Sequence, residues 1–100
     1  MATHSEVMAE LRTEVDAAYA ENLDLAGMAR LPLLNATIKE AMRIYPPSTA
    51  LFTRVAKRDL EIAGTAVRKG TLVVAPIWQM HRNERYFANP ESFDPRRFLP

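Results

Sequence analysis

The 100-residue sequence predicts an α+β fragment: two helices, a small antiparallel sheet and a long irregular tail. Three observations predict this fold class. Residues 1–45 repeat apolar side chains at helical spacing, and the middle of the chain alternates apolar with polar residues around two glycines. The last part, residues 78–100, separates its aromatic side chains by proline and asparagine.

The first helix is expected from about Ser5 to Tyr19. Its apolar residues recur every four positions: Val7, Leu11 and Val15. Thr3 followed by Glu6 is typical of a capping box at a helix start. The next stretch, Glu21 to Arg30, has weaker periodicity and contains Gly27, so we expect a connector with one helical turn.

The second helix is expected from Pro32 to Tyr45. Proline is tolerated at the first helical position, and Pro46 and Pro47 end the helix by removing donors and restricting the residue before them. Its apolar stripe consists of Leu34, Ile38, Met42 and Tyr45.

Beyond Pro47 the pattern becomes that of strands. Apolar residues at 51–56, at 60–67 around an expected turn at Gly64, and at 72–77 after a turn at Lys69-Gly70 predict three short strands of one antiparallel meander. The tail that follows contains more aromatic residues than a 100-residue core has places for. The chain is therefore expected to be a fragment of a larger domain.

Composition excludes several kinds of site. The chain has 13 Lys plus Arg against 12 Asp plus Glu and no Cys, so the total charge does not indicate a nucleic-acid binder. Without Cys it has no disulfide, no thiolate metal site and no cysteine nucleophile. No run approaches the roughly 20 apolar residues of a membrane span, so we expect no membrane segment, and a soluble parent would be cytoplasmic.

Glu40 and Arg43 are three residues apart, close enough to meet on a helix, on the side opposite the apolar stripe. Two interpretations remain open from spacing alone. An exposed pair would contribute about 0.2 to 0.5 kcal/mol. A buried pair would need every donor of the arginine satisfied, and a second arginine converging on the carboxylate would make it a fixed network.

Two motifs in this order resemble those of the cytochrome P-450 haem-thiolate monooxygenases. Glu40-Ala41-Met42-Arg43 resembles the Glu-x-x-Arg motif of that family, and Phe93-Asp94-Pro95-Arg96-Arg97-Phe98 resembles its Phe-x-Pro-x-Arg-Phe motif. Between them lie Tyr45-Pro46-Pro47 and His81-Arg82-Asn83, where Asn83 replaces the usual Asp. Arg96 stands where Glu is frequent, which we interpret as a tolerated surface change. The resemblance covers nearly the whole chain.

The resemblance implies one partial domain over residues 1–100: helix J and a connector at about 4–30, helix K at 32–45, the sheet at 51–77 and the meander at 78–100. Its structural triad, which fixes the meander against helix K, corresponds to Glu40, Arg43 and Arg97. Arg54 corresponds to the arginine that pairs with a haem propionate, a role suited to a guanidinium. The residues expected to shape an apolar substrate pocket are Ala50, Leu51 and Phe52.

For the complete parent the resemblance implies a haem-dependent monooxygenase that inserts one oxygen atom from O2 into an apolar small molecule. Electrons would come from a redox partner, either a ferredoxin or a flavoprotein reductase. This chain contains neither the family's Cys loop nor its oxygen-activating helix I, so we assign no catalytic residue and no metal ligand. The isolated chain is expected to be inactive and not to bind haem stably.

Two alternatives remain open. The chain could be a non-enzymatic module that binds a protein through its aromatic tail and basic half, or a degenerate family remnant. His4 and His81 lack a second ligand at metal spacing, so we expect packing or hydrogen-bonding roles for them.

Overall fold

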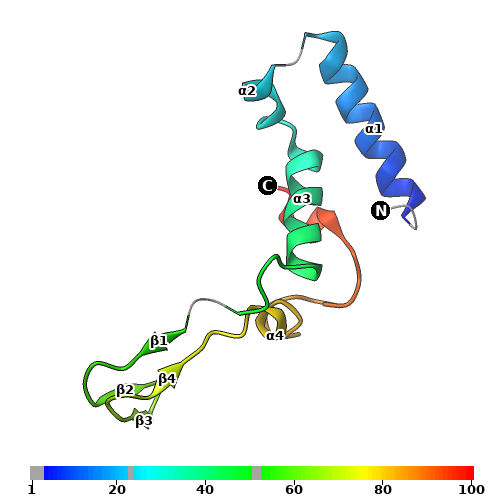
Figure 1. Ribbon diagram of the computed structural model, residues 1–100. Coiled ribbons are helices and arrows are strands. Elements are labelled where there is room, and N and C mark those ends of the chain that lie inside the picture. Colours follow the sequence, from blue (N-terminus) through cyan, green and yellow to red (C-terminus); the bar gives the residue numbers. More distant parts are fainter. Residues whose placement is uncertain (1–3, 23, 51–52) are drawn as a thin grey trace. The chain divides into compact units, whose positions relative to one another are not determined.

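The computed structural model describes residues 4–22, 24–50 and 53–100. The chain forms two compact units: residues 1–45 together with 92–100 make the first, and residues 46–91 make the second. Figure 1 labels the elements. In chain order these are α1 Ser5–Ala20, α2 Leu25–Met28, α3 Pro32–Ile44, β1 Arg54–Val55, β2 Leu60–Ile62, β3 Thr65–Val67, β4 Leu72–Val73, α4 Ile77–His81 and the 3-10 helix η1 Pro95–Phe98.

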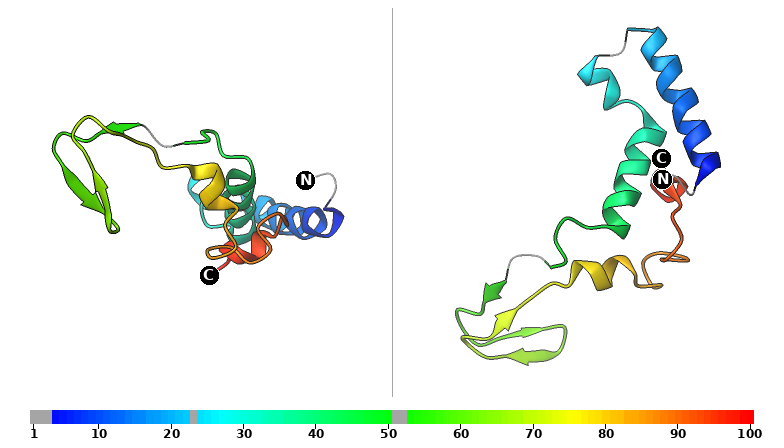
Figure 2. Two further views of the ribbon diagram at one scale, coloured as in Figure 1. Left: turned by 90° about the horizontal axis from the view of Figure 1, so that it is seen from below. Right: turned by 45° about the vertical axis from the view of Figure 1, so that its right-hand side comes forward.

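In the first unit, α1 and α3 lie side by side (Figures 1 and 2), joined by a connector that holds the single helical turn α2. α1 begins at Ser5 as expected and buries Val7 and Leu11. Thr3 of the expected capping box lies outside the described residues, and His4 at the N-cap position makes no side-chain capping bond. Asp24 caps α2 by accepting a 2.6 Å hydrogen bond from the Gly27 N–H.

α3 begins at Pro32 and is capped by a carboxylate from another helix. Glu14 of α1 accepts hydrogen bonds of 2.9 Å from the backbone N–H groups of Leu33 and Leu34, one with each oxygen. These N–H groups have no intrahelical partner at a helix start, so Glu14 fixes this end of α3 against α1. The helix stops at Ile44, directly before the Tyr45-Pro46 step.

On α3 the polar face is buried and the apolar face is exposed, which is the reverse of the usual arrangement. Ala36, Thr37, Glu40 and Arg43 are buried, whereas the apolar stripe is largely exposed, with Ile38 48%, Met42 51% and Tyr45 78% accessible. Amphipathic patterning would place that stripe against a core. In this chain the polar side of the helix is covered instead, because η1 packs against it.

The second unit corrects the expectation of one three-stranded meander. β2 and β3 form a separate antiparallel hairpin with Leu60 opposite Val67, while β4 pairs antiparallel with β1, Arg54 lying opposite Val73. The hairpin closes through Ala63 and Gly64, both at positive φ, as a tight two-residue turn requires. That closure leaves the chain beside β1, so β4 pairs there rather than extending the hairpin. The α+β fold class holds.

The tail was expected to be irregular throughout, but parts of it are helical. Ile77–His81 forms the short helix α4 in the second unit, since this stretch lacks the prolines that interrupt its surroundings, and Pro95–Phe98 forms η1 in the first unit. α4 is anchored by a 3.2 Å hydrogen bond from the Trp78 N–H to the Thr49 carbonyl. In the described ranges no helix is long and apolar enough to cross a membrane.

Candidate functional site

The Glu40 carboxylate is fully buried at the centre of the first unit, and α3 supplies its first partner. One helical turn later, Arg43 donates from Nε to Glu40 Oε2 at 2.7 Å and from Nη2 to Oε1 at 2.8 Å. Arg43 is itself only 2% accessible. The planar guanidinium therefore grips the carboxylate with two parallel bonds, out of contact with solvent.

The chain segment around η1 completes the cluster from the other side. Arg97 donates from Nε to Glu40 Oε1 at 3.2 Å, and the backbone N–H of Asp94 donates to the same oxygen at 2.9 Å. The Ser92 carbonyl accepts from Nη2 of Arg43 at 3.2 Å and from Nη2 of Arg97 at 3.4 Å. One carboxylate thus joins side chains and backbone more than 50 positions apart in the sequence.

Opposing effects act on the pKa of Glu40. Burial raises that pKa, but the hydrogen bonds from Arg43 and from the Asp94 N–H, with the charges of Arg43 and Arg97, outweigh burial and hold the pKa below its ordinary value. Glu40 is consequently a carboxylate at neutral pH. A buried anion held by two cations is suited to fixing a structure.

Each histidine contacts an aromatic ring. His4 stacks on Phe93 with ring centroids 4.9 Å apart, and His81 meets Phe87 edge to face at 6.2 Å. Across the described part of the chain, no group of three or more His, Cys, Asp or Glu side chains could hold a metal ion.

The other residues selected from the sequence belong to the second unit. Arg54 lies exposed on β1 and forms no ion pair with any described residue. An exposed guanidinium without a carboxylate partner fits a propionate, but the chain has no Cys to supply a thiolate to iron. Ala50 is half-buried beside the segment anchored through Thr49, and Leu51 and Phe52 lie outside the described residues.

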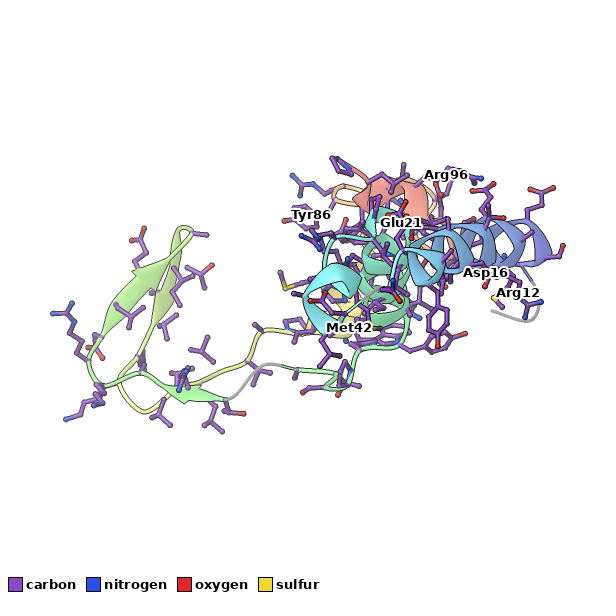
Figure 3. All side chains as sticks on the ribbon, turned by 90° about the horizontal axis from the view of Figure 1, so that it is seen from above. Arg12, Asp16, Glu21, Met42, Tyr86 and Arg96 are labelled. Atoms are coloured by element: carbon purple, nitrogen blue, oxygen red, sulfur yellow. The ribbon has the colours of Figure 1, made fainter. Side chains whose placement is uncertain are left out.

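Three groups that form hydrogen bonds within the first unit could not be predicted from the sequence. The Asp94 N–H and the Ser92 carbonyl are backbone groups, for which residue type carries no signal, and Glu14 is 19 positions from the helix end that it caps. Arg96, expected as a neutral surface change, forms a 2.7 Å ion pair with Glu10 of α1. Figure 3 shows Arg96 on the side of η1 that is nearer to α1.

Known proteins are similar to this chain over the same residues that form the two units. The family model described as Cytochrome P450 matches residues 1–100. Cytochrome P450 3A18 of Rattus norvegicus is 37% identical over 100 residues, covering 98% of this chain and 20% of that protein. Ferruginol synthase of Isodon rubescens is 39% identical over 94 residues, covering 92% of this chain and 19% of the relative.

Steroid 17-alpha-hydroxylase/17,20 lyase of Ictalurus punctatus is 38% identical over 98 residues, covering 96% of this chain and 19% of that enzyme. The chain therefore spans about a fifth of the length of these relatives. Among solved structures, a zebrafish cytochrome P450 with progesterone superimposes with a TM-score of 0.86 at 34% identity, over 97% of this chain and 24% of the other. A structure of a zebrafish cytochrome P450 with abiraterone gives 0.87 at 34% identity, over 98% and 25%.

Proposed function

Because the chain belongs to the cytochrome P450 family, we propose that it forms the brace on one side of the haem in a haem-dependent monooxygenase. The complete protein would insert one oxygen atom from O2 into an apolar organic molecule, with electrons from a ferredoxin or a flavoprotein reductase. The names of these relatives, Ferruginol synthase and Steroid 17-alpha-hydroxylase/17,20 lyase among them, describe those proteins. To this chain we extend only the apolar substrate class that the family resemblance implies.

The observation that carries this proposal is the Glu40 cluster. In the family's motifs the corresponding Glu, Arg and Arg join helix K to the meander, and here Glu40 accepts hydrogen bonds from Arg43 of α3 and Arg97 of η1. We assign these three residues the role of a structural triad. An independent surface module would have no need to bury a charged carboxylate completely, since an exposed pair would fold as well.

The haem role of this chain would be limited to one contact. Arg54, exposed and without an ion-pair partner among the described residues, would hold a haem propionate through its paired donors. When bound, haem supplies the oxidising chemistry, and the protein supplies position and electrostatics. The thiolate ligand would come from residues outside this sequence, because the sequence has no Cys.

The exposed apolar stripe of α3 supports a larger parent. Ile38, Met42 and Tyr45 present a continuous apolar surface that a finished domain would cover. In the parent we expect other parts of the protein to pack there. Residues 48–52, which follow α3, would then border the substrate, with Ala50, Leu51 and Phe52 as the pocket side chains.

The proposal is tested by the coding sequence on both sides of this segment. We expect an in-frame Phe-x-x-Gly-x-Arg-x-Cys-x-Gly loop shortly after Pro100, which would make the complete protein a haem-thiolate enzyme. A natural stop codon directly after Pro100 would contradict the monooxygenase assignment and leave a degenerate remnant.

The 100-residue chain itself provides the second test. Mixed with haem, it is expected to show no thiolate-type absorbance and to oxidise no substrate, because the axial ligand is missing. Thiolate-type absorbance from this chain would contradict the assigned division of roles. An Arg54→Gln variant of the complete protein should weaken haem retention, whereas Arg85→Gln, another exposed arginine of the same unit, should not.

A further inference from the structure

Residues 48–50, the described part of the segment proposed to border the substrate, are tied to α4 through a backbone carbonyl. Ser48 and Thr49 are exposed, and Ala50 is half-buried. The Thr49 carbonyl accepts a 3.2 Å hydrogen bond from the N–H of Trp78, the second residue of α4 (Figure 1). The position of Thr49 and of its neighbour Ala50 therefore depends on where α4 lies.

α4 is too short to hold that position by helix formation alone. It has five residues, and helices this short are marginal in water because nucleation costs more than a few hydrogen bonds return. The Trp78 N–H lies in the first turn, where backbone donors have no partner within the helix, so the Thr49 carbonyl satisfies it from outside. This hydrogen bond fixes Thr49 only as firmly as other contacts hold α4.

Arg82, directly after α4, supplies such a contact. Its side chain is only 15% accessible, and its Cζ lies 4.3 Å from the centroid of the Trp78 ring. The two residues are one helical turn apart, so the guanidinium reaches back over the helix onto the indole. A guanidinium over an indole face is attracted by the ring electrons, and the attraction grows where water is excluded. Arg82 and Trp78 thus hold the turn of α4 closed.

Arg82 also contacts Glu91, but this contact has less weight. Arg82 Nε lies 3.3 Å from Glu91 Oε1, and the Glu91 side chain is 76% accessible. An ion pair this exposed is screened and contributes little. Trp78, by contrast, carries both the ring that Arg82 covers and the N–H that Thr49 accepts from. The path from Arg82 to the segment before the pocket therefore runs through Trp78.

We propose that Arg82 is a positioning residue for substrate binding: its stacking on Trp78 holds α4, and α4 holds Thr49 and thereby Ala50 at the edge of the pocket. Arg82 acts through Trp78 and needs no contact with the substrate. The inference rests on the proposed function, because that function places Ala50 beside an apolar substrate.

Hydrogen exchange of the Trp78 amide in the 100-residue chain tests the link from Arg82 to Thr49. Arg82→Gln should speed exchange of this amide about fivefold, the factor expected when a partly desolvated cation–π contact is lost. Glu91→Gln should change it by less than about twofold. Amides of α3 should exchange at the wild-type rate in both variants, because opening of α4 is local.

Arg85→Gln is the matched control. Arg85 is another arginine of the second unit, is exposed and forms no ion pair with a described residue. Its loss should leave exchange of the Trp78 amide unchanged. Arg82→Lys keeps the charge but not the planar group that stacks on the indole, so it should restore only part of the protection. Equal acceleration by Arg82→Gln and Arg85→Gln would overturn the proposal, as would no acceleration by Arg82→Gln.

Two haem ligands separate the pocket from the haem in the complete protein. Imidazole binds the iron alone, whereas phenylimidazole adds an apolar ring that must fit the pocket. By haem absorbance, Arg82→Gln should weaken phenylimidazole binding about fivefold, as the amide exchange does, and leave imidazole binding unchanged. The ratio of the two affinities does not respond to a general loss of stability. An unchanged ratio would give Arg82 a structural role only and overturn the proposal.

Failure of the proposed function would look different. If imidazole causes no change in haem absorbance in the wild type, the haem role fails, and the substrate role of Arg82 fails with it. If imidazole binds the wild type and Arg82→Gln equally, and phenylimidazole does too, the haem role stands and only the positioning role is wrong.

Discussion

The two units of this chain treat charge in contrasting ways. In the first unit the most deeply buried large side chains include Glu40 and Arg43, and almost every polar atom around them has a partner. In residues 53–75 of the second unit only Ala56 is buried, and the cations of the turns have no carboxylate partner among the described residues. The first unit pairs the charges at its centre, whereas residues 53–75 of the second unit leave their cations exposed.

The first unit can bury charge because segments that are distant in the sequence pack together in it. Residues 92–98 come back to α3 and bring Arg97, the Asp94 N–H and the Ser92 carbonyl to Glu40. The strands of the second unit are two or three residues long and form two separate two-stranded ladders, β1 with β4 and β2 with β3. A network that closes within the chain can bury charge, but two-stranded ladders this short cannot exclude water from their side chains.

The largest expected effect breaks the first unit at its centre. Glu40→Ala leaves Arg43 buried without its carboxylate and should cost about 3 to 5 kcal/mol of unfolding free energy. Loss of helical circular dichroism on urea titration of the 100-residue chain measures this. A cost below about 1 kcal/mol, the range of an exposed pair, would contradict the closed network.

A change in the second unit should leave the first intact. Gly64 has φ +80° in the hairpin turn, a conformation that costs an L residue about 1 to 2 kcal/mol, so Gly64→Ala should destabilise the hairpin by about that amount. Hydrogen exchange should speed up at the β2 and β3 amides and stay unchanged in α3. Faster exchange in α3 as well would show that the units do not unfold separately.

A gain in stability is expected at one position of the first unit. Thr37 is 3% accessible, and its Oγ1 has no hydrogen-bond partner among the described residues. Thr37→Val replaces the hydroxyl by a methyl of similar size and should stabilise the chain by about 1 kcal/mol. Destabilisation, measured in the same urea titration, would mean that the hydroxyl has a partner.

The smallest effect is expected at the rim of the same unit. Arg96 and Glu10 form a 2.7 Å ion pair, but their side chains are 53% and 48% accessible. Glu10→Gln should therefore cost at most about 1 kcal/mol, and the difference should vanish at high salt. A larger cost, or one that salt does not reduce, would place this pair with the buried network instead of outside it.

The same contrast explains what the sequence could predict. Helix periodicity and the prolines located α1 and α3 within one or two residues, because those signals are local. Strand pairing is non-local. The turn at Gly64 was expected, but the pattern did not indicate that β2 pairs only with β3 while β4 pairs with β1. The short helices α4 and η1 were missed because each spans only four or five residues, too few for a helical period to show.

The site, like the fold, could be predicted only in part from the sequence. The resemblance to the family's two motifs selected Glu40, Arg43 and Arg97, and the structure brings all three side chains together. The spacing of Glu40 and Arg43 did not show whether their side chains are buried, because their burial depends on residues 92–98 packing against α3. The contributions of Glu14 and of two backbone groups carry no local sequence signal.

The Glu40 carboxylate is charged and satisfied by partners within the chain, and the pH dependence of stability tests this most directly. Its pKa in the folded chain is lowered from the ordinary 4.5, so its contribution is fully present above that value and is lost as the pH falls through the folded pKa. Urea titrations of the wild type and Glu40→Gln from neutral to acid pH measure the difference in unfolding free energy. We predict a large difference at pH 7 that shrinks below about pH 4.5; a difference independent of pH would contradict the claim.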